Sequence, residues 1–191
     1  MASKNETRQH ILQTAVSLFQ SQGYARTTTQ AIAAEAGVAE VTLFRHFGSK
    51  EKLFQAVVGQ VGGTAVLTQI ENQLSGDYHA DLLFVTKHIL QILTAQRETI
   101  RLMMFEASHF PEVQVAVTKN PRELRQLLSR YFQQQIDRGL VRPLDPEIMA
   151  QSLFGTLFGY AVGLDEPLSV DISLDEIAAQ FVDIFVEGTA V

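Results

Sequence analysis

Cysteine is absent from the 191-residue chain. Without cysteine the protein can form neither a disulfide nor a thiolate metal site, and it has no thiol nucleophile. A reducing compartment is therefore compatible with the sequence, and we expect the protein to be cytoplasmic. The chain is long enough to bury a substantial core in one large or two small domains.

Patterns typical of secretion, membrane insertion and catalysis are missing as well. Residues 1–8 are polar, so we expect no signal peptide. One uncharged stretch, residues 148–164, is shorter than the roughly 20 apolar residues of a transmembrane helix and contains Gln151 and Thr156. We interpret it as a buried helix and expect no membrane partner. The chain has no glycine-rich phosphate loop, no His-Glu-x-x-His motif and no supported Ser-His-Asp arrangement, so we expect neither an enzyme nor a metal or cofactor site.

Basic residues are fewer than acidic ones, and the formal net charge is −6. The two signs are unevenly distributed along the chain. Residues 1–55 contain six basic and four acidic residues and carry +2, whereas the remainder carries −8. This asymmetry favours an N-terminal part that faces a polyanion and a C-terminal part that does not.

The hydrophobic spacing is helical nearly throughout, so we predict an all-α fold. After two short helices within residues 27–47, Ser49 caps a helix that begins at Lys50. After a break at Gly62-Gly63, further helices are predicted at about 65–74, 80–95, 98–108, 113–117, 122–138 and 146–164. Asn120-Pro121 is predicted to stop the helix at 113–117, and Pro146 to be the first residue of the helix at 146–164. A last helix is predicted to be capped by Ser173 and Glu176 and to run to Gly188. We predict a domain at residues 1–48 and a larger helical domain at residues 49–191.

Residues 27–47 predict two short helices joined by a tight turn. Thr27 with Gln30 fits a capping box, and Thr28 is an equally good cap. Gly37 follows the first short helix where a left-handed residue is preferred, which glycine adopts without steric cost. A short helix, a glycine turn and a second helix with a polar outer face are typical of the helix-turn-helix, whose second helix can enter the major groove of DNA.

The surrounding residues resemble a known family. The segments that carry the resemblance are Gly23-Tyr24, Thr27-Thr28, Ile32-Ala33, Ala36-Gly37-Val38, Leu43 to Phe47 and Ser49 to Leu53. In order and spacing they resemble the N-terminal signature of TetR/AcrR-type transcriptional regulators, from about Ile11 to Leu53. The remainder resembles the family in length and helical pattern. The resemblance implies a ligand-responsive DNA-binding regulator, a repressor, that binds a near-palindromic operator in double-stranded DNA as a homodimer.

The predicted DNA-binding residues lie on the outer face and at helix starts: Thr28, Thr29, Gln30, Glu40, Thr42, Phe44, Arg45, His46 and Lys50. Arg45 is the candidate for a base contact, because its guanidinium can pair with guanine O6 and N7; a solvated or salt-bridged arginine is the alternative. The resemblance implies phosphate contacts at Thr28, Phe44, His46 and Lys50.

Three residues depart from the family pattern. Phe44 replaces the usual tyrosine and lacks its hydroxyl, and Ala39 replaces the usual serine cap. Glu40 places an acid at the DNA face, where it could accept a hydrogen bond from cytosine N4 or repel phosphates.

The homodimer is predicted to form through the helices near 122–138 and 146–164, where the resemblance places the family's interface. In the second of these, Gly155, Gly159 and Gly163 lie on one face, and three interior glycines cost roughly 2–3 kcal/mol in helix propensity. Close approach of another helix would offset that cost; packing within one chain is the alternative.

A small, largely hydrophobic effector is predicted to bind in the C-terminal domain. The candidate residues are Phe84, His88, Met103, Met104, Phe105, His109 and Phe132. The alternative for each is an ordinary core residue. Two other functions stay open at this stage: an architectural DNA-binding protein without effector control, and a helical small-molecule-binding protein or enzyme with a vestigial hairpin.

Overall fold

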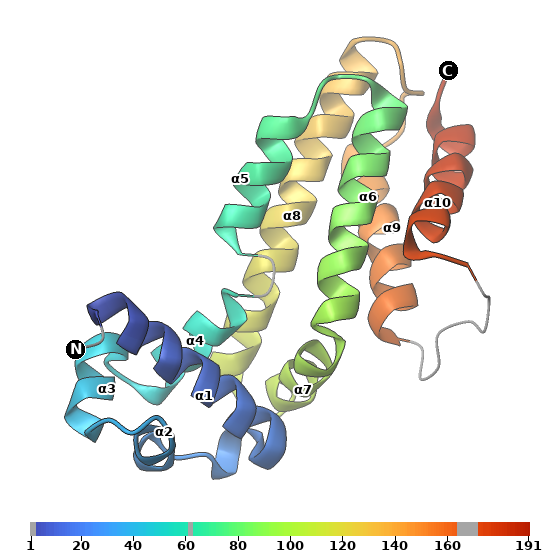
Figure 1. The fold of residues 1–191 in the computed structure, drawn as a ribbon. Coiled ribbons are helices and arrows are strands. Elements are labelled where there is room, and N and C mark those ends of the chain that lie inside the picture. The colour runs from blue at the N-terminus through green and yellow to red at the C-terminus, as the bar shows by residue number, and fades with distance from the viewer. Residues whose placement is uncertain (1–2, 61–62, 164–171) are drawn as a thin grey trace. The chain divides into compact units, whose positions relative to one another are not determined.

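The computed structural model describes residues 3–60, 63–163 and 172–191 of the chain (Figure 1). Within these ranges the regular elements are helices, which confirms the predicted all-α fold. In chain order they are α1 (Lys4–Arg26), α2 (Thr29–Glu35), α3 (Glu40–Phe47), α4 (Lys50–Val58), α5 (Thr64–Gln73), α6 (Tyr78–Ala95), α7 (Arg97–Ala107), α8 (Pro111–Asp137), α9 (Pro146–Phe158), the π-helical turn η1 (Gly159–Gly163) and α10 (Leu174–Thr189). They group into two compact units.

The first unit contains α1 to α4, α7 from Glu98 onward and the start of α8 up to Asn120. Its core is formed by apolar side chains of the first four helices, joined by Met103 from α7 and Val113 from α8. Three aromatic rings, those of Phe19, Tyr24 and Phe54, pack with centroid separations of 4.9 to 5.6 Å. Helices that follow α4 by dozens of residues therefore complete the core of the N-terminal helices.

A kink at Gly23 connects α1 to α7. Gly23 has φ +79° and ψ 163° inside the span of α1, a conformation open essentially to glycine alone. The kink directs the amide of Tyr24 at the buried Glu106, whose Oε1 accepts it at 2.9 Å. A Cβ at position 23 would lie 2.7 Å from the same oxygen. Backbone conformation and close approach therefore both require glycine here.

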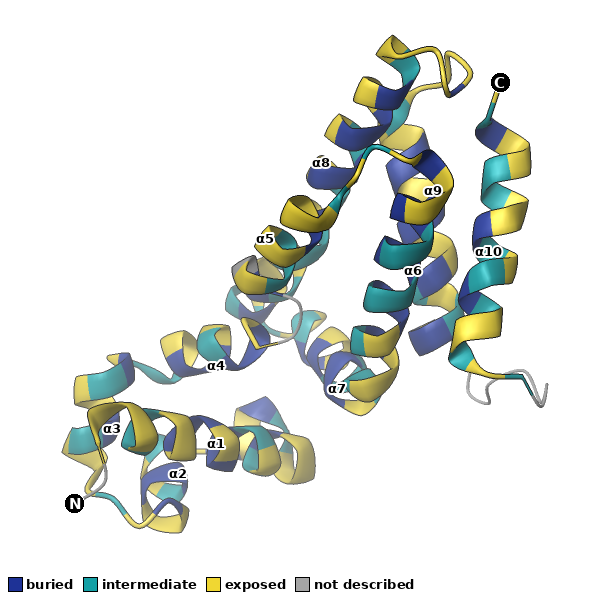
Figure 2. Cartoon of the chain, turned by 45° about the horizontal axis from the view of Figure 1, so that its top comes forward, coloured by how far each residue is buried: buried dark blue, intermediate teal, exposed yellow. Residues whose placement is uncertain are grey.

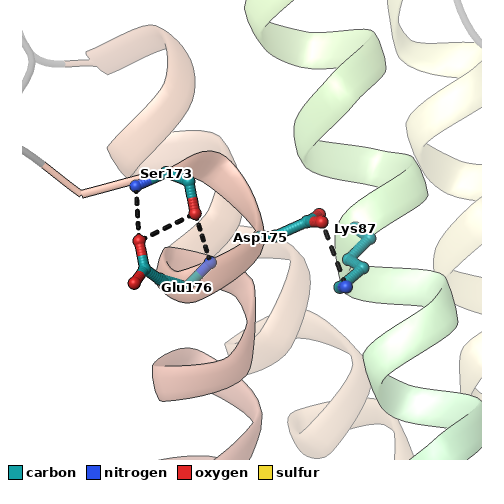
Figure 3. Close-up of polar contacts among 4 residues, drawn as sticks. All are labelled: Lys87, Ser173, Asp175 and Glu176. Atoms are coloured by element: carbon teal, nitrogen blue, oxygen red, sulfur yellow. Dashed lines mark hydrogen bonds and ion pairs between the residues drawn. The ribbon is translucent and has the colours of Figure 1, made fainter.

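The second unit contains α5, α6, α8 from Pro121 onward, α9, η1 and α10. Helix α10 packs along α6, and two polar pairs connect them: Lys87 Nζ lies 3.4 Å from Asp175, and His79 Nε2 lies 3.1 Å from Asp183. Figure 3 shows the first pair beside the start of α10, where Ser173 and Glu176 form the predicted capping box.

A buried carboxylate, Asp81, organises the chain that leads into α6. Asp81 is 3% exposed and accepts hydrogen bonds from the amides of Ser75 and Gly76, both at 2.7 Å. The Tyr131 hydroxyl of α8 donates to it at 2.9 Å. Burial, together with this carboxylate, raises the pKa of Tyr131 above its usual range. The loop before α6 is thereby fixed against α8.

Two sequence predictions about helix ends are wrong. Thr27 does not cap α2: its buried hydroxyl donates to the carbonyls of Gly23 and Leu18 instead, and Thr28 is the cap. The predicted stop at Asn120-Pro121 is also absent, because α8 runs through Pro121 as one helix. A proline removes one intrahelical hydrogen bond without ending a helix whose other contacts hold it. The passage from the first unit to the second falls at this residue.

Other helix ends agree with the sequence predictions. Ser49 caps α4, Pro146 opens α9, and the helical pattern is interrupted between Val58 and Thr64. Gly62, half of the predicted break, lies outside the described residues, as does Leu164 at the predicted end of the 146–164 helix. That helix becomes π-helical at η1. The domain boundary predicted after residue 48 stays a prediction.

No helix in the part of the chain that the structure describes is long and apolar enough to cross a membrane.

Candidate nucleic-acid interface

Helices α2 and α3 form a helix-turn-helix hairpin whose geometry is fixed at its ends. The Thr28 hydroxyl accepts the Ala31 amide at 3.0 Å and so caps α2. Gly37 has φ +64°, the left-handed conformation predicted for it, and the Val38 amide donates back to the Ala33 carbonyl at 2.9 Å. The turn therefore directs the chain into α3 with its backbone groups satisfied.

Helix α3 presents most of its predicted contact residues outward. Its buried residues are Leu43 and Phe47, which anchor it to the core. On the other side Phe44 is 43% exposed, and Glu40 and Arg45 are exposed as well. Thr42 and His46 are half-buried. The side chains predicted to contact DNA thus share the surface side of α3.

The first turn of α2 lies against the first turn of α3. The Thr29 hydroxyl donates to Glu40 Oε1 at 2.7 Å, which joins the two helices through their first residues. Gln30 beside it is exposed. Ala39 provides no side-chain cap for α3. The predicted residues of α2 and the start of α3 therefore form one continuous edge.

A cluster of positive charges adjoins this edge, and the sequence pattern predicts half of it. The pKa of His46 is lowered, first by burial and then by the charges of Arg45, Lys4 and Arg8. The Arg8 guanidinium also lies 5.0 Å from the centroid of the Phe47 ring. Lys4 and Arg8 were missed because they precede α3 by dozens of residues; their i, i+4 spacing on one face of α1 is the signal that sequence offered.

Lys50 has a more structural environment than expected. Its ammonium lies 4.2 Å from the centroid of the Tyr24 ring and 3.4 Å from the Ala25 carbonyl oxygen. Burial lowers its pKa. A cation above an aromatic face is stabilised by the ring's quadrupole. Lys50 therefore holds the start of α4 against the end of α1, and its contact with a phosphate stays a prediction.

The predicted effector-binding residues are divided between the two units. In the first unit Met103 belongs to the core, while Met104 and Phe105 are 50% and 65% exposed, and the ring of His109 packs on Phe105. In the second unit the rings of Phe84 and His88 lie 5.1 Å apart on α6, and Phe132 is fully buried against Phe185. Within either unit these residues form pairs and core contacts, and the predicted common site stays a prediction.

Metal ligands do not gather in the described parts of the chain: no group of three His, Asp or Glu side chains there is placed to hold an ion.

Two family models together cover most of the chain. Residues 11–57 match the model of bacterial regulatory proteins of the tetR family, and residues 80–187 match the C-terminal domain model of AefR-like transcriptional repressors. The first match contains the whole helix-turn-helix hairpin.

Individual proteins agree with these models. The uncharacterised HTH-type transcriptional regulator YvkB of Bacillus subtilis strain 168 is 31% identical over 156 residues, covering 82% of each chain. The nucleoid occlusion factor SlmA of Vibrio vulnificus is 28% identical and covers 83% of each. Among solved structures, SmeT in complex with triclosan superposes with a TM-score of 0.81 at 26% identity, covering 97% of this chain and 92% of SmeT. NalD of Pseudomonas aeruginosa, the secondary repressor of the MexAB-OprM multidrug efflux pump, has a TM-score of 0.75 at 22% identity, covers 98% of each chain and shares the fold.

We predict that nucleic-acid affinity rises as the pH falls, through His46. In the free protein, burial and three positive neighbours disfavour the imidazolium and lower the pKa. A phosphate placed beside His46 would favour the imidazolium and raise the pKa, so binding would take up a proton. As the pH falls from above the pKa of the bound imidazole to below the lowered pKa of the free one, affinity should rise in total by about tenfold for each unit by which binding raises that pKa.

Fluorescence anisotropy with a labelled duplex at constant ionic strength measures this dependence. His46→Gln should flatten the pH profile, whereas His79→Gln, which removes an exposed histidine from α6, should leave it intact. An unaltered profile in His46→Gln would contradict the assignment.

Proposed function

Because the chain belongs to the TetR family of bacterial regulatory proteins and is a transcriptional regulator, we propose that it acts as a repressor. We propose further that two copies bind a near-palindromic operator and that a small hydrophobic effector releases the DNA. The observation that carries the proposal is the capped hairpin whose second helix presents Arg45 beside the basic residues of α1.

The proposed DNA contacts divide into two kinds. Arg45, exposed on α3, is assigned to a guanine, since a guanidinium matches O6 and N7 of that base. Lys4, Arg8 and His46 are assigned to phosphates, with Thr28 and Lys50 at helix starts. The +2 charge of residues 1–55 is small, but its basic groups gather near α3, which raises the local potential.

Selection from a randomised duplex library tests DNA recognition directly. The wild type should enrich a near-palindromic sequence. Arg45→Ala should lose about 1–3 kcal/mol on that sequence and relax the preference at one position of each half-site. Lys50→Ala should weaken binding to all sequences about equally and reduce the slope of log affinity against log salt by about one. The melting temperature of this variant is also measured, because Lys50 packs on Tyr24.

Arg130→Ala removes an exposed arginine from α8 in the second unit and serves as the matched control. If Arg45→Ala keeps the wild-type motif and affinity, the base contact is wrongly assigned.

A homodimer is proposed because α9 exposes an apolar and small-residue face. Ile148 is 66% exposed, and Gly155, Gly159 and Gly163 are exposed along the same helix and η1. Among the residues that the structure describes, a Cβ added at Gly159 or Gly163 would meet no atom within 4 Å beyond the adjacent residues and the helix's own backbone. Contacts among the described residues therefore do not require glycine at these two positions, and close approach by a second copy would account for it.

The second helix of the interface is proposed to be α10. The sequence predicts that role for residues 122–138, but the exposed side chains in this range are polar: Arg122, Gln126, Arg130, Gln133, Gln134 and Asp137 of α8, and Arg138 directly after it. Helix α10 instead exposes Ile184, whose side chain is 70% exposed. Figure 2 shows exposed positions along α10. Apolar residues at an interface core favour α9 with α10. Two recognition helices about 34–36 Å apart would then contact successive major grooves.

Gly159→Leu should convert the dimer into monomers. The added side chain finds open space in one chain and improves helix propensity, so the fold should survive while the second copy is pushed away. DNA affinity should fall at least about 100-fold, because the two half-sites are no longer bound together. Sedimentation velocity and anisotropy measure the two effects. Gln91→Leu adds the same side chain to an exposed position of α6 as a control, and an intact Gly159→Leu dimer would refute this interface.

The effector is proposed to be a largely hydrophobic small molecule that binds beside α6. Phe84 and His88 are half-buried neighbours there and offer an aromatic face and one polar group. SmeT, which is similar over 97% of this chain, has a structure in complex with triclosan, and this supports a ligand of that character.

Titration with triclosan and other hydrophobic probes tests effector control. A true effector should raise the melting temperature, because binding adds about 2.7 kcal/mol to the free energy of unfolding at 100 times its Kd. The same effector should also lower the affinity for DNA. Phe84→Ala should abolish both responses. Phe105→Ala tests whether the predicted effector-binding residues that lie in the first unit contribute. If no hydrophobic probe shifts melting and none releases DNA, effector control at this place is wrong.

A further inference from the structure

An acidic side chain stands at the leading end of the recognition helix. Glu40 is the first residue of α3 and is exposed, beside a cluster that is otherwise positive. We propose that Thr29 and Glu40 act together as a specificity device that recognises one cytosine in each half-site. This inference rests on the proposed DNA-binding function and names the base that the hairpin selects.

The carboxylate is held in place before DNA arrives. The Thr29 hydroxyl donates to Glu40 Oε1 at 2.7 Å, across the junction between α2 and α3. Thr29 is half-buried, and the adjacent Thr28 fixes the start of α2 by capping it. A side chain that is already oriented loses less freedom on binding than a free one. With Oε1 engaged, Oε2 is available to accept a hydrogen bond.

The chemistry of the base edges selects the partner. In the major groove guanine offers two acceptors and thymine offers an acceptor and a methyl group, so both oppose a carboxylate. Adenine has a donor at N6, but its N7 acceptor lies alongside and repels a second oxygen. Cytosine presents its N4 amino group beside a non-polar C5–H, with no acceptor on the major-groove edge of the same base. A fixed carboxylate therefore favours cytosine over the other three bases.

The position of Glu40 agrees with this role. In a helix-turn-helix the N-terminal residues of the second helix contact base edges, and Glu40 is the first of them. A carboxylate near phosphates costs binding energy on every sequence, so a gain on particular sequences is needed to offset it. The competing explanation is that Glu40 only stabilises the start of α3, where negative charge is favourable and Ala39 gives no side-chain cap. Such a role would not depend on the DNA sequence.

Selection from a randomised duplex library with the purified full-length protein distinguishes these explanations. The wild type should enrich cytosine at one symmetric pair of positions. Glu40→Gln should change the enriched base to adenine, because an amide matches adenine N6 and N7 together. Glu40→Ala should lose the preference at that pair alone, by about tenfold per half-site.

Thr29 is tested as the positioning residue. Thr29→Val keeps the shape but removes the hydroxyl, and should weaken the cytosine preference without changing the base; Thr29→Ser should restore it. Glu35→Gln removes the same charge from an exposed position at the end of α2 and should leave the motif unchanged. Circular dichroism melting confirms that each variant is folded.

Each outcome decides the proposal. A motif that stays the same in Glu40→Gln and Glu40→Ala, with affinity raised equally on all duplexes, overturns it and leaves Glu40 as a source of repulsion or helix stabilisation. Full cytosine preference in Thr29→Val overturns the positioning role of Thr29. A wild type that enriches no sequence overturns the proposed DNA-binding function and this inference with it, which separates that failure from the first.

Discussion

The hydrogen bond from the Tyr24 amide to Glu106 is the interaction on which the first unit depends. It exists because Gly23 bends α1 in a way that residues with a Cβ cannot follow, and because the buried Glu106 carboxylate lies 2.9 Å from the amide that the bend frees. The ring of Tyr24 then packs on Phe54 and supports the ammonium of Lys50. The end of α1, the start of α4 and α7 are thus joined at one residue. A DNA-binding hairpin that looks local in sequence is supported by α7, which begins fifty residues after α3 ends.

Charge is organised in a similar way, by position more than by amount. The chain is acidic overall, yet α1 contributes Lys4 and Arg8 to the environment of Arg45 and His46. These like charges disfavour one another in the free protein, and together with burial, which contributes most, they lower the pKa of His46. A polyanion relieves that repulsion. The same groups therefore destabilise the free protein slightly and favour the state in which a polyanion is bound.

The sequence predicted most of what depends on neighbouring residues and little of what depends on distant ones. The caps at Thr28, Ser49 and Ser173 and the turn at Gly37 follow from residue types a few positions apart, and the structure confirms them. Thr27 was misassigned because its hydroxyl finds carbonyls of the preceding helix, a choice that only packing decides. The contributions of Lys4, Arg8 and Glu106 arise from helix packing. The i, i+4 spacing of Lys4 and Arg8 places them on one face of α1, but no local pattern indicates which helix that face adjoins.

Proline and the aromatic residues show the same limit. A stop at Pro121 is the sensible expectation from backbone chemistry, since a proline inside a helix costs about 3 kcal/mol. Helix α8 continues nevertheless, with buried residues such as Ala116 and Leu124 on both sides of the proline. For Phe84, Met103 and Phe132, composition indicates burial but does not distinguish a filled core from a ligand site. Which of the two applies is decided by the volume that neighbouring helices leave, and residue types alone do not fix that volume.

The way α3 is anchored has an evolutionary consequence. Of its eight residues, only Leu43 and Phe47 are buried. Substitutions at the exposed positions Val41, Phe44 and Arg45 should change stability by no more than about 0.5 kcal/mol each, because surface changes away from caps and cores rarely do more. The proposed operator preference and the fold therefore depend largely on different residues of the same short helix. After gene duplication, one copy could acquire a new operator in a few steps without needing compensating mutations elsewhere in the chain.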